Sequence, residues 1–402
     1  PEIRDGFVRK RRDVCRRWSP AQTTNSPVEV APMGDVAKRG PLAGLELEFV
    51  GDRLKKSFKR RDAFKGGFAT LGALAMATGV GRHVTAAQGL ASLGLLPEDL
   101  PEKQFTAATS EVGAGSTWVA HGMETAKFFG DLLGVEVTSF DGQFSVEKQL
   151  QDLQTISSQD FDFVAVHPSA SDALVDAANQ IIAKGVPLID MDTRLVQDPA
   201  EFAEFGHLTY LEPDNIYMGS TVANELFKAM GGEGQVIHTQ GQLAHTGAQG
   251  RAEGFRQTLE NYPNIEVVDE TPGDWQIEQV ASLWQDLLQR FPDVKGGFFH
   301  SDDMALAAQS VVEAAGKQDQ VLLVGVDGLK NACEAILEDK LLASVINPSG
   351  RIHGGAIWAG YLTVSGTDMA EGGVPKFIRT DGGPITKDNA AGYIWLHDNM
   401  QY

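Results

Sequence analysis

One stretch constrains the fold of this chain more than any other: the apolar run from Val186 to Arg194 (VPLIDMDTR) ends abruptly in Asp192, Thr193 and Arg194. A strand buried on both faces of a parallel sheet has nearly continuous hydrophobic sequence, and ligands of open α/β sheets bind beyond the carboxyl ends of such strands. The polar tail is therefore a candidate ligand site. Taken alone, it also fits a turn capped by Asp192 and paired with Arg194.

Repetition of the same arrangement favours the sheet over the turn. Apolar runs closed by a polar residue alternate with segments of helical periodicity. In the first half, we expect strands at 105–110, 135–140, 161–166 and 186–191, and helices at 119–133, from 145 onward, and at 171–184. In the second half, we expect strands at 234–239, 265–268, 297–300, 321–326 and 342–346, and helices at 218–230, 252–261, 277–291, 302–315 and 352–364. Successive strand–helix–strand units predict parallel α/β sheets with right-handed crossovers.

Length and charge narrow the possible partners. A chain of 402 residues suits two α/β lobes and an appendage. Residues 87–402 hold 45 Asp and Glu against 17 Lys and Arg, which excludes nucleic acid and an anionic membrane surface as partners. The only cysteines are Cys15 and Cys333, so no disulfide framework is available, and Cys333 is expected to be a small buried hydrophobe.

The amino-terminal region is expected to lie outside the lobes. Residues 1–58 are basic and aperiodic, which predicts a disordered or non-native leader. Residues 59–87 contain KRRDAFK, a short apolar run rich in glycine and alanine, and the small residues of VTAAQ. This is the pattern of an export signal and resembles those of the twin-arginine pathway, with cleavage near Ala86 or Ala87. A soluble glycine-rich helix with a chance arginine pair is the alternative.

The polar residues at the strand ends suit a neutral ligand with many hydroxyl groups. Carboxylates accept hydrogen bonds from hydroxyls, amides and guanidinium groups donate them, and indole faces cover C–H surfaces. Either tryptophan could instead be a packing residue of the core. The candidates from the strand ends are Ser110, Asp192, Arg194, Ser301, Asp327 and Asn347, with Trp118 and Trp275 near them.

Motifs of catalysis and metal binding are absent from the sequence. The patterns GxGxxG, Walker A, GxSxG and HExxH do not occur, and the histidines stand singly. Asp302 and Asp303 are adjacent and would point apart on a helix, so Asp302 fits a helix cap better than a metal pair. We therefore expect no enzymatic activity, no cofactor and no metal site.

Six stretches, in order, resemble the type I periplasmic sugar-binding proteins of ABC transporters, nearest their ribose-binding branch. They are VHPSASDAL (167–174 with the preceding valine), VPLIDMDTR, GAQGRAEGF (247–255), HSDDMALAA (300–308), LVGVDG (323–328) and INPSGRIHGG (346–355). The resemblance implies an α/β fold of two Rossmann-like lobes joined by a three-strand hinge. It places one lobe at 101–212 with 348–378 and the other at 213–347 with 379–402, with hinges near 211–215, 347–348 and 376–380.

The resemblance also implies which residues hold the ligand. The family's ligand acids correspond to Asp192 and Asp327, its amide to Asn347, and its aromatics to Trp118 and Trp275. Three departures from the family pattern point away from ribose itself: Gln249 stands where an arginine holds a pyranose, Ser301 replaces an asparagine, and the first loop brings Glu111 near the cleft. The full expected set is Ser110, Glu111, Trp118, Asp192, Thr193, Arg194, Gln249, Trp275, Ser301, Asp327 and Asn347.

The expected function is that of an exported, monomeric receptor in the periplasm. It would capture a small neutral sugar or polyol between its lobes and deliver it to an ABC transporter permease in the inner membrane. A periplasmic sugar or autoinducer receptor that feeds a chemoreceptor or sensor kinase is the alternative. A related repressor would need a DNA-reading helix-turn-helix ahead of the lobes, where this chain has a signal and an acidic body.

Overall fold

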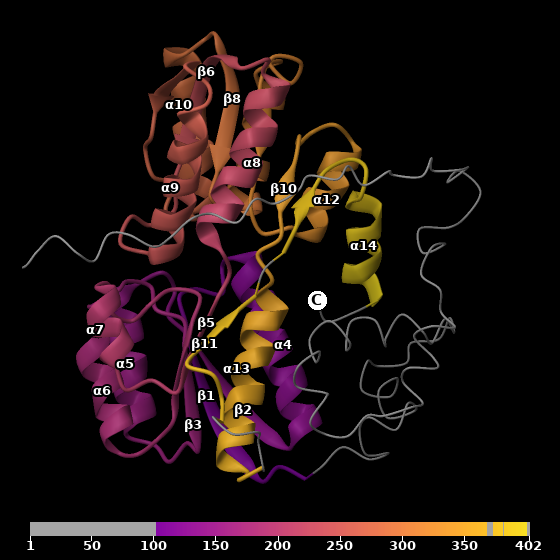
Figure 1. The fold of residues 1–402 in the computed structure, drawn as a ribbon. Coiled ribbons are helices and arrows are strands. Elements are labelled where there is room, and N and C mark those ends of the chain that lie inside the picture. The colour runs from indigo at the N-terminus through magenta and orange to yellow at the C-terminus, as the bar shows by residue number, and fades with distance from the viewer. Residues whose placement is uncertain (1–101, 368–372, 381, 400–402) are drawn as a thin grey trace, which may run out of the picture. The chain divides into compact units, whose positions relative to one another are not determined.

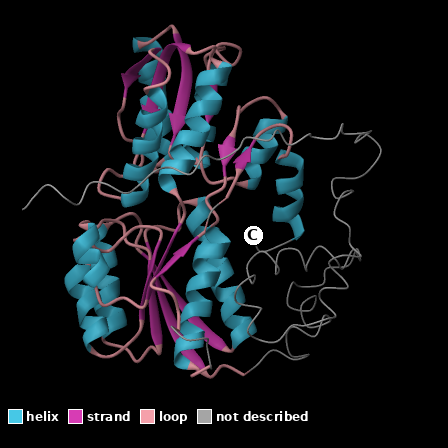
Figure 2. Cartoon of the chain, viewed as in Figure 1, coloured by secondary structure: helices cyan, strands magenta, loops and turns pink. Residues whose placement is uncertain are grey.

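The computed structural model describes residues 102–367, 373–380 and 382–399. The leader and the export signal expected in residues 1–87 lie outside these described residues. Two lobes, each built on a parallel sheet with helices packed against it, make up this part of the chain (Figures 1 and 2). No described helix combines the length and apolar character that a membrane span requires.

The first lobe is built on a six-stranded sheet in the order β11-β5-β4-β3-β1-β2, and all its neighbouring strands are parallel. Its strands are β1 (Phe105–Glu111), β2 (Val135–Asp141), β3 (Phe163–Val166), β4 (Leu188–Met191), β5 (Thr209–Glu212) and β11 (Phe377–Arg379). Its helices are α4 (Thr117–Leu133), α5 (Val146–Ser157), α6 (Val175–Ala183), α7 (Pro199–Glu204) and α13 (Ser349–Val364). Helices α5 and α6 cover one face, and α4 packs with α13 on the other (Figure 1).

The second lobe is built on a four-stranded parallel sheet in the order β7-β6-β8-β9, beside an antiparallel pair of β10 and β12. Its strands are β6 (Glu233–Thr239), β7 (Asn264–Asp269), β8 (Val294–Phe299), β9 (Leu322–Val324), β10 (Ser344–Val345) and β12 (Pro384–Ile385). Its helices are α8 (Asn215–Ala229), α9 (Thr246–Leu259), α10 (Ile277–Arg290), α11 (Asp302–Ala314), α12 (Lys330–Leu337) and α14 (Ala390–Asn399). The doubly wound α/β architecture expected from the alternating pattern is confirmed.

Three segments of the described chain connect the two lobes. Pro213 and Asp214 join β5 to α8, residues 346–348 join β10 to α13, and the residues after Arg379 lead from β11 to β12. Arg379 is thus part of a first-lobe strand, although the resemblance places residue 379 in the second lobe. Three crossings of this kind form the hinge of a two-lobed protein.

Local signals explain most element boundaries. Ser145 caps α5 by accepting a hydrogen bond from Lys148 N, as its position before an amphipathic run predicts. Gly134 ends α4 in the left-handed conformation, with φ 70°. The main difference concerns α9, which begins at Thr246, whereas the polar sequence of residues 240–250 predicts a loop, with a helix only from Ala252. Packing explains this difference, because glycine lets α9 lie close against α8.

The contact between α8 and α9 depends on small residues on both helices. A Cβ atom at Gly254 would lie 2.1 Å from the backbone oxygen of Ile216, and one at Gly219 would lie 2.1 Å from that of Arg251. Since neither backbone oxygen can move without moving its helix, these two positions require glycine. The close approach also fixes the position of Arg251, whose side chain enters the candidate site described below.

We expect Gly254→Ala to lower the free energy of unfolding by about 1–3 kcal/mol, because overpacking at a backbone contact forces the helices apart. Gly392→Ala on α14 is the matched control, since nothing lies within 4 Å of its added Cβ, and alanine favours a helix. Urea unfolding of both variants checks the expectation. Equal midpoints for Gly254→Ala and the wild type would contradict it.

Candidate functional site

A cavity at the carboxyl ends of the strands is lined by side chains from both lobes. Its walls include the residue after β4, the residue that precedes α11 and the loop after β9, where parallel strands of α/β sheets present ligand groups. The lining consists of Val112, Ser116, Trp118, Val119, Phe144, His167, Asp192, His245, Arg251, Trp275, Ser301, Asp327 and Asn347. Apolar and aromatic surface therefore surrounds a small set of charged and amide groups.

The two carboxylates of the cavity stand on unusual backbone. Asp192 has φ 57° and Asp327 has φ 125°, and Trp275 at the same site has φ 59°. Positive φ is uncommon outside glycine and costs on the order of 1–3 kcal/mol where surrounding structure enforces it. Phe144, which also lines the cavity, has φ 56°. Such strain clusters at ligand sites, so its presence at four lining residues supports a binding role for this cavity.

Arg251 is the main positive group of the second lobe in the cavity. It is buried and lies 3.9 Å from the carboxylate of Asp327. The nitrogen at this distance, Nη1, donates to the backbone oxygen of His300, and Nε donates to Asn215 Oδ1 at 3.0 Å. In the orientation that gives both amide atoms of Asn347 a partner, the amide oxygen accepts from Arg251 Nη2 at 2.8 Å. Arg251 thus connects α9 to α8, to the end of β8 and to the hinge segment after β10.

Both tryptophans flank the polar groups. Trp118, at the start of α4, donates from Nε1 to the backbone oxygen of Asn347 at 2.8 Å, which ties the first lobe to the hinge. Trp275 is half-buried and packs edge-on against His245, with ring centroids 4.7 Å apart. Indole surfaces so placed can cover the C–H groups of a ligand whose hydroxyls meet Asp192 and Asp327.

A chain of buried ionisable groups runs from helix α13 into the cavity. His353 Nε2 lies 3.2 Å from Glu111 Oε2, and the same oxygen lies 3.5 Å from His167 Nδ1. His167 Nε2 and His245 Nε2 each lie 3.6 Å from Asp192 Oδ2. Burial opposes the charge on Glu111, but His353 and His167 outweigh it and lower the Glu111 pKa to about 2. Burial lowers the pKa of His245 to about 3, so this ring is neutral.

Two of these groups of side chains have the residue types of a metal site: Glu111 with His167 and His353, and His167 with Asp192 and His245. The hydrogen bonds argue against a metal. His245 Nδ1 accepts from the backbone N–H of Gly247 at 3.1 Å, so Nε2 of this neutral ring carries the hydrogen and has no lone pair for a metal. His167 serves both groups, and each of its nitrogens faces a carboxylate, which suits an N–H donor.

The lobes touch on both sides of the cavity. Thr117 at the start of α4 donates to Asp303 of α11 through its backbone N and through Oγ1, both at 2.9 Å. On the other side, Thr193 Oγ1 contacts Nδ1 of His245 at 2.7 Å, and the backbone N of Arg194 donates to Thr246 Oγ1 at 3.2 Å. The described arrangement is therefore one in which the two lobes have closed on each other.

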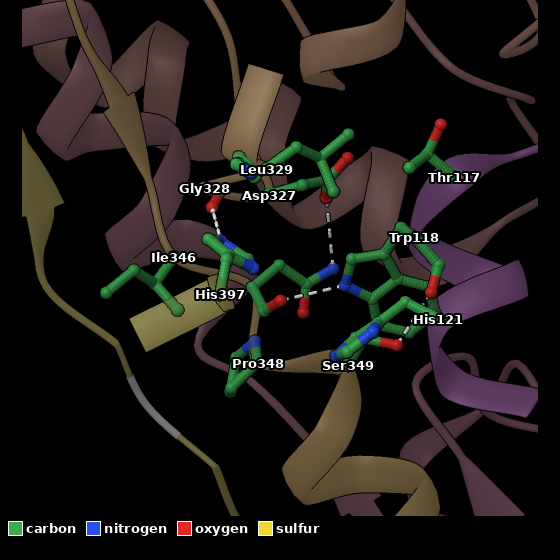
Figure 3. Close-up of a pocket in the computed structure, with 12 residues that line it drawn as sticks. Thr117, Trp118, His121, Asp327, Gly328, Leu329, Ile346, Pro348, Ser349 and His397 are labelled. Carbon is green, nitrogen blue, oxygen red and sulfur yellow. Dashed lines mark hydrogen bonds between the residues drawn. The ribbon is translucent and has the colours of Figure 1, made fainter. Parts of the chain in front are cut away.

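A second cavity, of about 110 Å³, lies beside the hinge and shares Trp118, Asp327 and Asn347 with the first (Figure 3). The amide of Asn347 lies 3.4 Å from Asp327 Oδ1. His397 of α14 contacts the backbone oxygen of Gly328 at 2.8 Å and so supports the loop that carries Asp327. The shared side chains form a wall between hinge and cleft, and a ligand bound in the cleft would contact the hinge directly.

Six of the residues expected from the sequence line the cleft: Trp118, Asp192, Trp275, Ser301, Asp327 and Asn347. Five do not. Ser110 is fully buried, and its hydroxyl accepts a hydrogen bond from Gln149. Glu111 is buried next to His167. The hydroxyl of Thr193 is hydrogen-bonded to His245. The Arg194 guanidinium lies over the ring of Phe202, and Gln249 is exposed and bonded to Gln197.

The position of Gln249 has a simple geometric cause. Residues two apart on a helix point about 200° apart, so Gln249 and Arg251 of α9 cannot both face the cleft. Arg251 does so, and the second lobe therefore has an arginine in the cleft after all. The resemblance matches the family's arginine to Gln249, two residues before Arg251 in the sequence.

The sequence pattern missed His167, His245 and Arg251 as cleft residues. His167 directly follows β3 as Asp192 directly follows β4, so the strand-end rule could have found it. Its solitary position in the sequence favoured a structural role instead. His245 caps α9 and Arg251 lies in the GAQGRAEGF stretch, and both signals depend on knowing where α9 begins.

Two doubly wound lobes, a three-segment hinge and a ligand-sized cleft between them define a two-lobed binding protein. The comparison with protein families agrees: the periplasmic binding protein domain family matches residues 112–368, and the chain belongs to this family. Members of the family are exported substrate-binding proteins and not enzymes.

Individual relatives give the same result. The ribose import binding protein RbsB of Escherichia coli strain K12 is 28% identical over 216 residues, covering 54% of this chain and 70% of the relative. The xylitol-binding protein of Mycolicibacterium smegmatis is 25% identical over 310 residues, covering 76% and 85%. The crystal structure of a galactofuranose-binding protein has a TM-score of 0.68 at 23% identity, covering 74% of this chain and 100% of that one. The chain is thus similar to ABC transporter binding proteins for sugars and polyols.

We expect Arg251→Met to lower the free energy of unfolding by about 3–5 kcal/mol, because it leaves Asp327 and the amide of Asn347 buried without their partner. Arg256→Met is the matched control on the same helix, since Arg256 is 52% exposed and its pair with Glu270 contributes at most about 1 kcal/mol. Chemical denaturation followed by tryptophan fluorescence measures both. Similar losses in the two variants would contradict the central role of Arg251.

Proposed function

We propose that this protein is an exported solute receptor that captures a small neutral sugar or polyol between its lobes and delivers it to an ABC transporter permease. The observation that carries the proposal is the cleft itself, where side chains from both lobes meet. It offers Asp192 and Asp327 as acceptors, Arg251 and Asn347 as polar partners, and two indoles as apolar walls. A hydroxyl paired to a charged group contributes about 1.5–3 kcal/mol, so this set favours a ligand with several hydroxyls.

The ligand class follows from the cleft and from the relatives' names. Ribose, xylitol and galactofuranose are the ligands in the names of three similar proteins, and all are neutral and rich in hydroxyls. The cleft carries aromatic side chains on both lobes, with Trp118 and Phe144 facing it from the first and Trp275 from the second. We infer a small neutral sugar or polyol whose hydroxyls meet the carboxylates and whose C–H surfaces are covered by the indoles.

The cellular setting belongs to the same proposal. We infer that residues 59–87 direct export by the twin-arginine pathway, since Arg60 and Arg61 precede an apolar run and small residues. The mature protein would act in the periplasm as a monomer. Its lobes would be 101–212 with 348–379 and 213–347 with 380–402, closing about the three crossings.

Native mass spectrometry of the protein purified without added sugar, combined with a thermal-shift screen, tests the proposal. The screen holds ribose, allose, xylitol, arabinofuranose and myo-inositol. A bound mass or a rise in melting temperature that grows with ligand concentration supports it, because a ligand of the native state stabilises that state. No bound mass and no shift across the panel would refute the proposed ligand class.

We expect Asp327→Ala to lower affinity for the ligand found in that screen by about 2 kcal/mol, or roughly 30-fold, because it removes a charged acceptor. Gln249→Ala is the control, since its side chain is exposed and outside the cleft. Isothermal titration calorimetry measures both variants. A larger loss of affinity in Gln249→Ala than in Asp327→Ala would show that Gln249 contacts the ligand and would contradict the role of Asp327.

We expect Thr117→Val to weaken ligand binding by about 1 kcal/mol, roughly fivefold, although Thr117 does not line the cleft. The lost bond from its hydroxyl to Asp303 joins the lobes and is available only when they are closed. Titration calorimetry gives the affinity, and small-angle scattering of the free protein shows the shift toward a more open form. Thr155→Val on the exposed side of α5 is the control. If Thr117→Val and this control bind the ligand with equal affinity, the bond between Thr117 and Asp303 does not stabilise the closed form.

A further inference from the structure

His167 is the buried histidine whose two ring nitrogens both face carboxylates. Nδ1 lies 3.5 Å from Glu111 Oε2 and Nε2 lies 3.6 Å from Asp192 Oδ2, which are ion-pair distances. Nδ1 has no hydrogen-bond partner among the described residues, and Nε2 also lies 3.5 Å from His245 Nε2. The two carboxylates lie at the ends of different strands, since Glu111 ends β1 and Asp192 follows β4. The side chains of all three residues are at most 3% exposed, so water does not screen their charges.

A neutral imidazole does not fit this place. It has one N–H and one lone pair, and its lone pair would point at a buried carboxylate whichever tautomer formed. An imidazolium has an N–H on both sides and compensates two buried negative charges at once. The geometry therefore favours a positively charged ring.

The neighbouring groups supply only part of this compensation. His353 on α13 lies 3.2 Å from Glu111 and lowers the pKa of that acid together with His167. His245 at the start of α9 contributes a neutral ring near Asp192. The guanidinium of Arg251 on α9, which contacts Asp327, also lowers the pKa of Asp192. The nearby acids Asp190 on β4 and Glu212 on β5 have their pKa values raised by burial.

We propose that His167 is a positioning residue of the ligand site: held as an imidazolium between Glu111 and Asp192, it fixes one oxygen of Asp192 and leaves the other to accept a ligand hydroxyl. The other oxygen, Asp192 Oδ1, is buried and has no hydrogen-bond partner among the described residues. The backbone oxygen of Asp192 is held separately by the hydroxyl of Tyr210 at 2.8 Å. This role rests on the proposed function and specifies how one acid of that site is oriented.

The pKa values of His167 and Glu111 support this role. Burial lowers the pKa of His167, but Asp192 and Glu111 outweigh burial and raise it to about 9. Because the folded pKa exceeds the usual value of 6.5, the contribution to stability is complete below that value and is lost as pH rises through about 9. The Glu111 pKa is lowered to about 2, so its contribution is present above its usual 4.5 and is lost only in strong acid. The paired state therefore spans neutral pH.

The first experiment observes the charge on His167 in the wild-type protein without ligand. Histidine-labelled protein gives long-range proton–nitrogen correlations, and the signal missing in His167→Asn identifies the ring. We expect both nitrogens of His167 to be protonated at neutral pH and to remain so until the pH approaches 9. His207, whose pKa is lowered to about 4 by burial, serves as the neutral reference. A neutral tautomer of His167 at neutral pH would overturn the proposal, whether or not any variant folds.

The second experiment measures binding of xylitol and ribose to His167→Asn, with His207→Asn as a control for a buried histidine away from the cleft. We expect His167→Asn to lower affinity about tenfold or more, because an asparagine amide lacks the charge and cannot donate to both carboxylates. Wild-type affinity should also fall as pH rises toward 9, whereas the variant's should stay flat. Unchanged affinity, or the same pH profile in both, would overturn the positioning role.

The two experiments separate this inference from the proposed function. If neither probe binds the wild type but His167 is doubly protonated, the ligand class is wrong and the charge assignment stands. If the probes bind and His167 is neutral, the proposed function stands and the positioning role is refuted.

Discussion

The structure depends on the compensation of negative charge that is buried between two lobes. Glu111, Asp192 and Asp327 stand within a few residues of strand ends and are shielded from water. An uncompensated buried carboxylate is too costly to keep, so each must meet a positive or donating group. His353 and His167 serve the first-lobe acids, and Arg251 of the second lobe lies 3.9 Å from Asp327, whose pKa burial still raises. A site of this kind holds acceptors for a ligand without needing an ion.

Topology explains why these groups meet at all. In the main sheet of each lobe, neighbouring strands run parallel, so their carboxyl ends lie at one edge of the sheet, and the hinge places these edges opposite each other. The backbone is also strained at residues that line the cleft, since Asp192, Trp275 and Asp327 have positive φ. Surrounding structure holds the backbone of these residues in this strained conformation. This suits side chains that must keep one orientation when no ligand is bound.

Much of this could be predicted from the sequence, because strand ends and helix periods are local signals. The run VPLIDMDTR placed Asp192 correctly at the cleft, and LVGVDG did the same for Asp327. Ser110, Glu111, Thr193 and Arg194 adjoin true strand ends, but their side chains contact Gln149, His167, His245 and Phe202 instead of lining the cleft. A local strand pattern does not encode tertiary contacts of this kind. Gln249 is expected from its match to the family's arginine, whereas Arg251 lines the cleft in the structure.

The histidines show a different limit of sequence reasoning. His167 and His245 are 78 residues apart and belong to different lobes, so no spacing rule could pair them. Their meeting requires the lobes to be closed, as does the contact between Thr117 and Asp303. Asn347 joins this closed arrangement to the hinge itself, because it accepts from Trp118 of the first lobe through its backbone and from Arg251 of the second through its amide. A ligand that contacts Asn347 would therefore act on the segment that joins the lobes, and this contact would couple binding to closure under the proposed function.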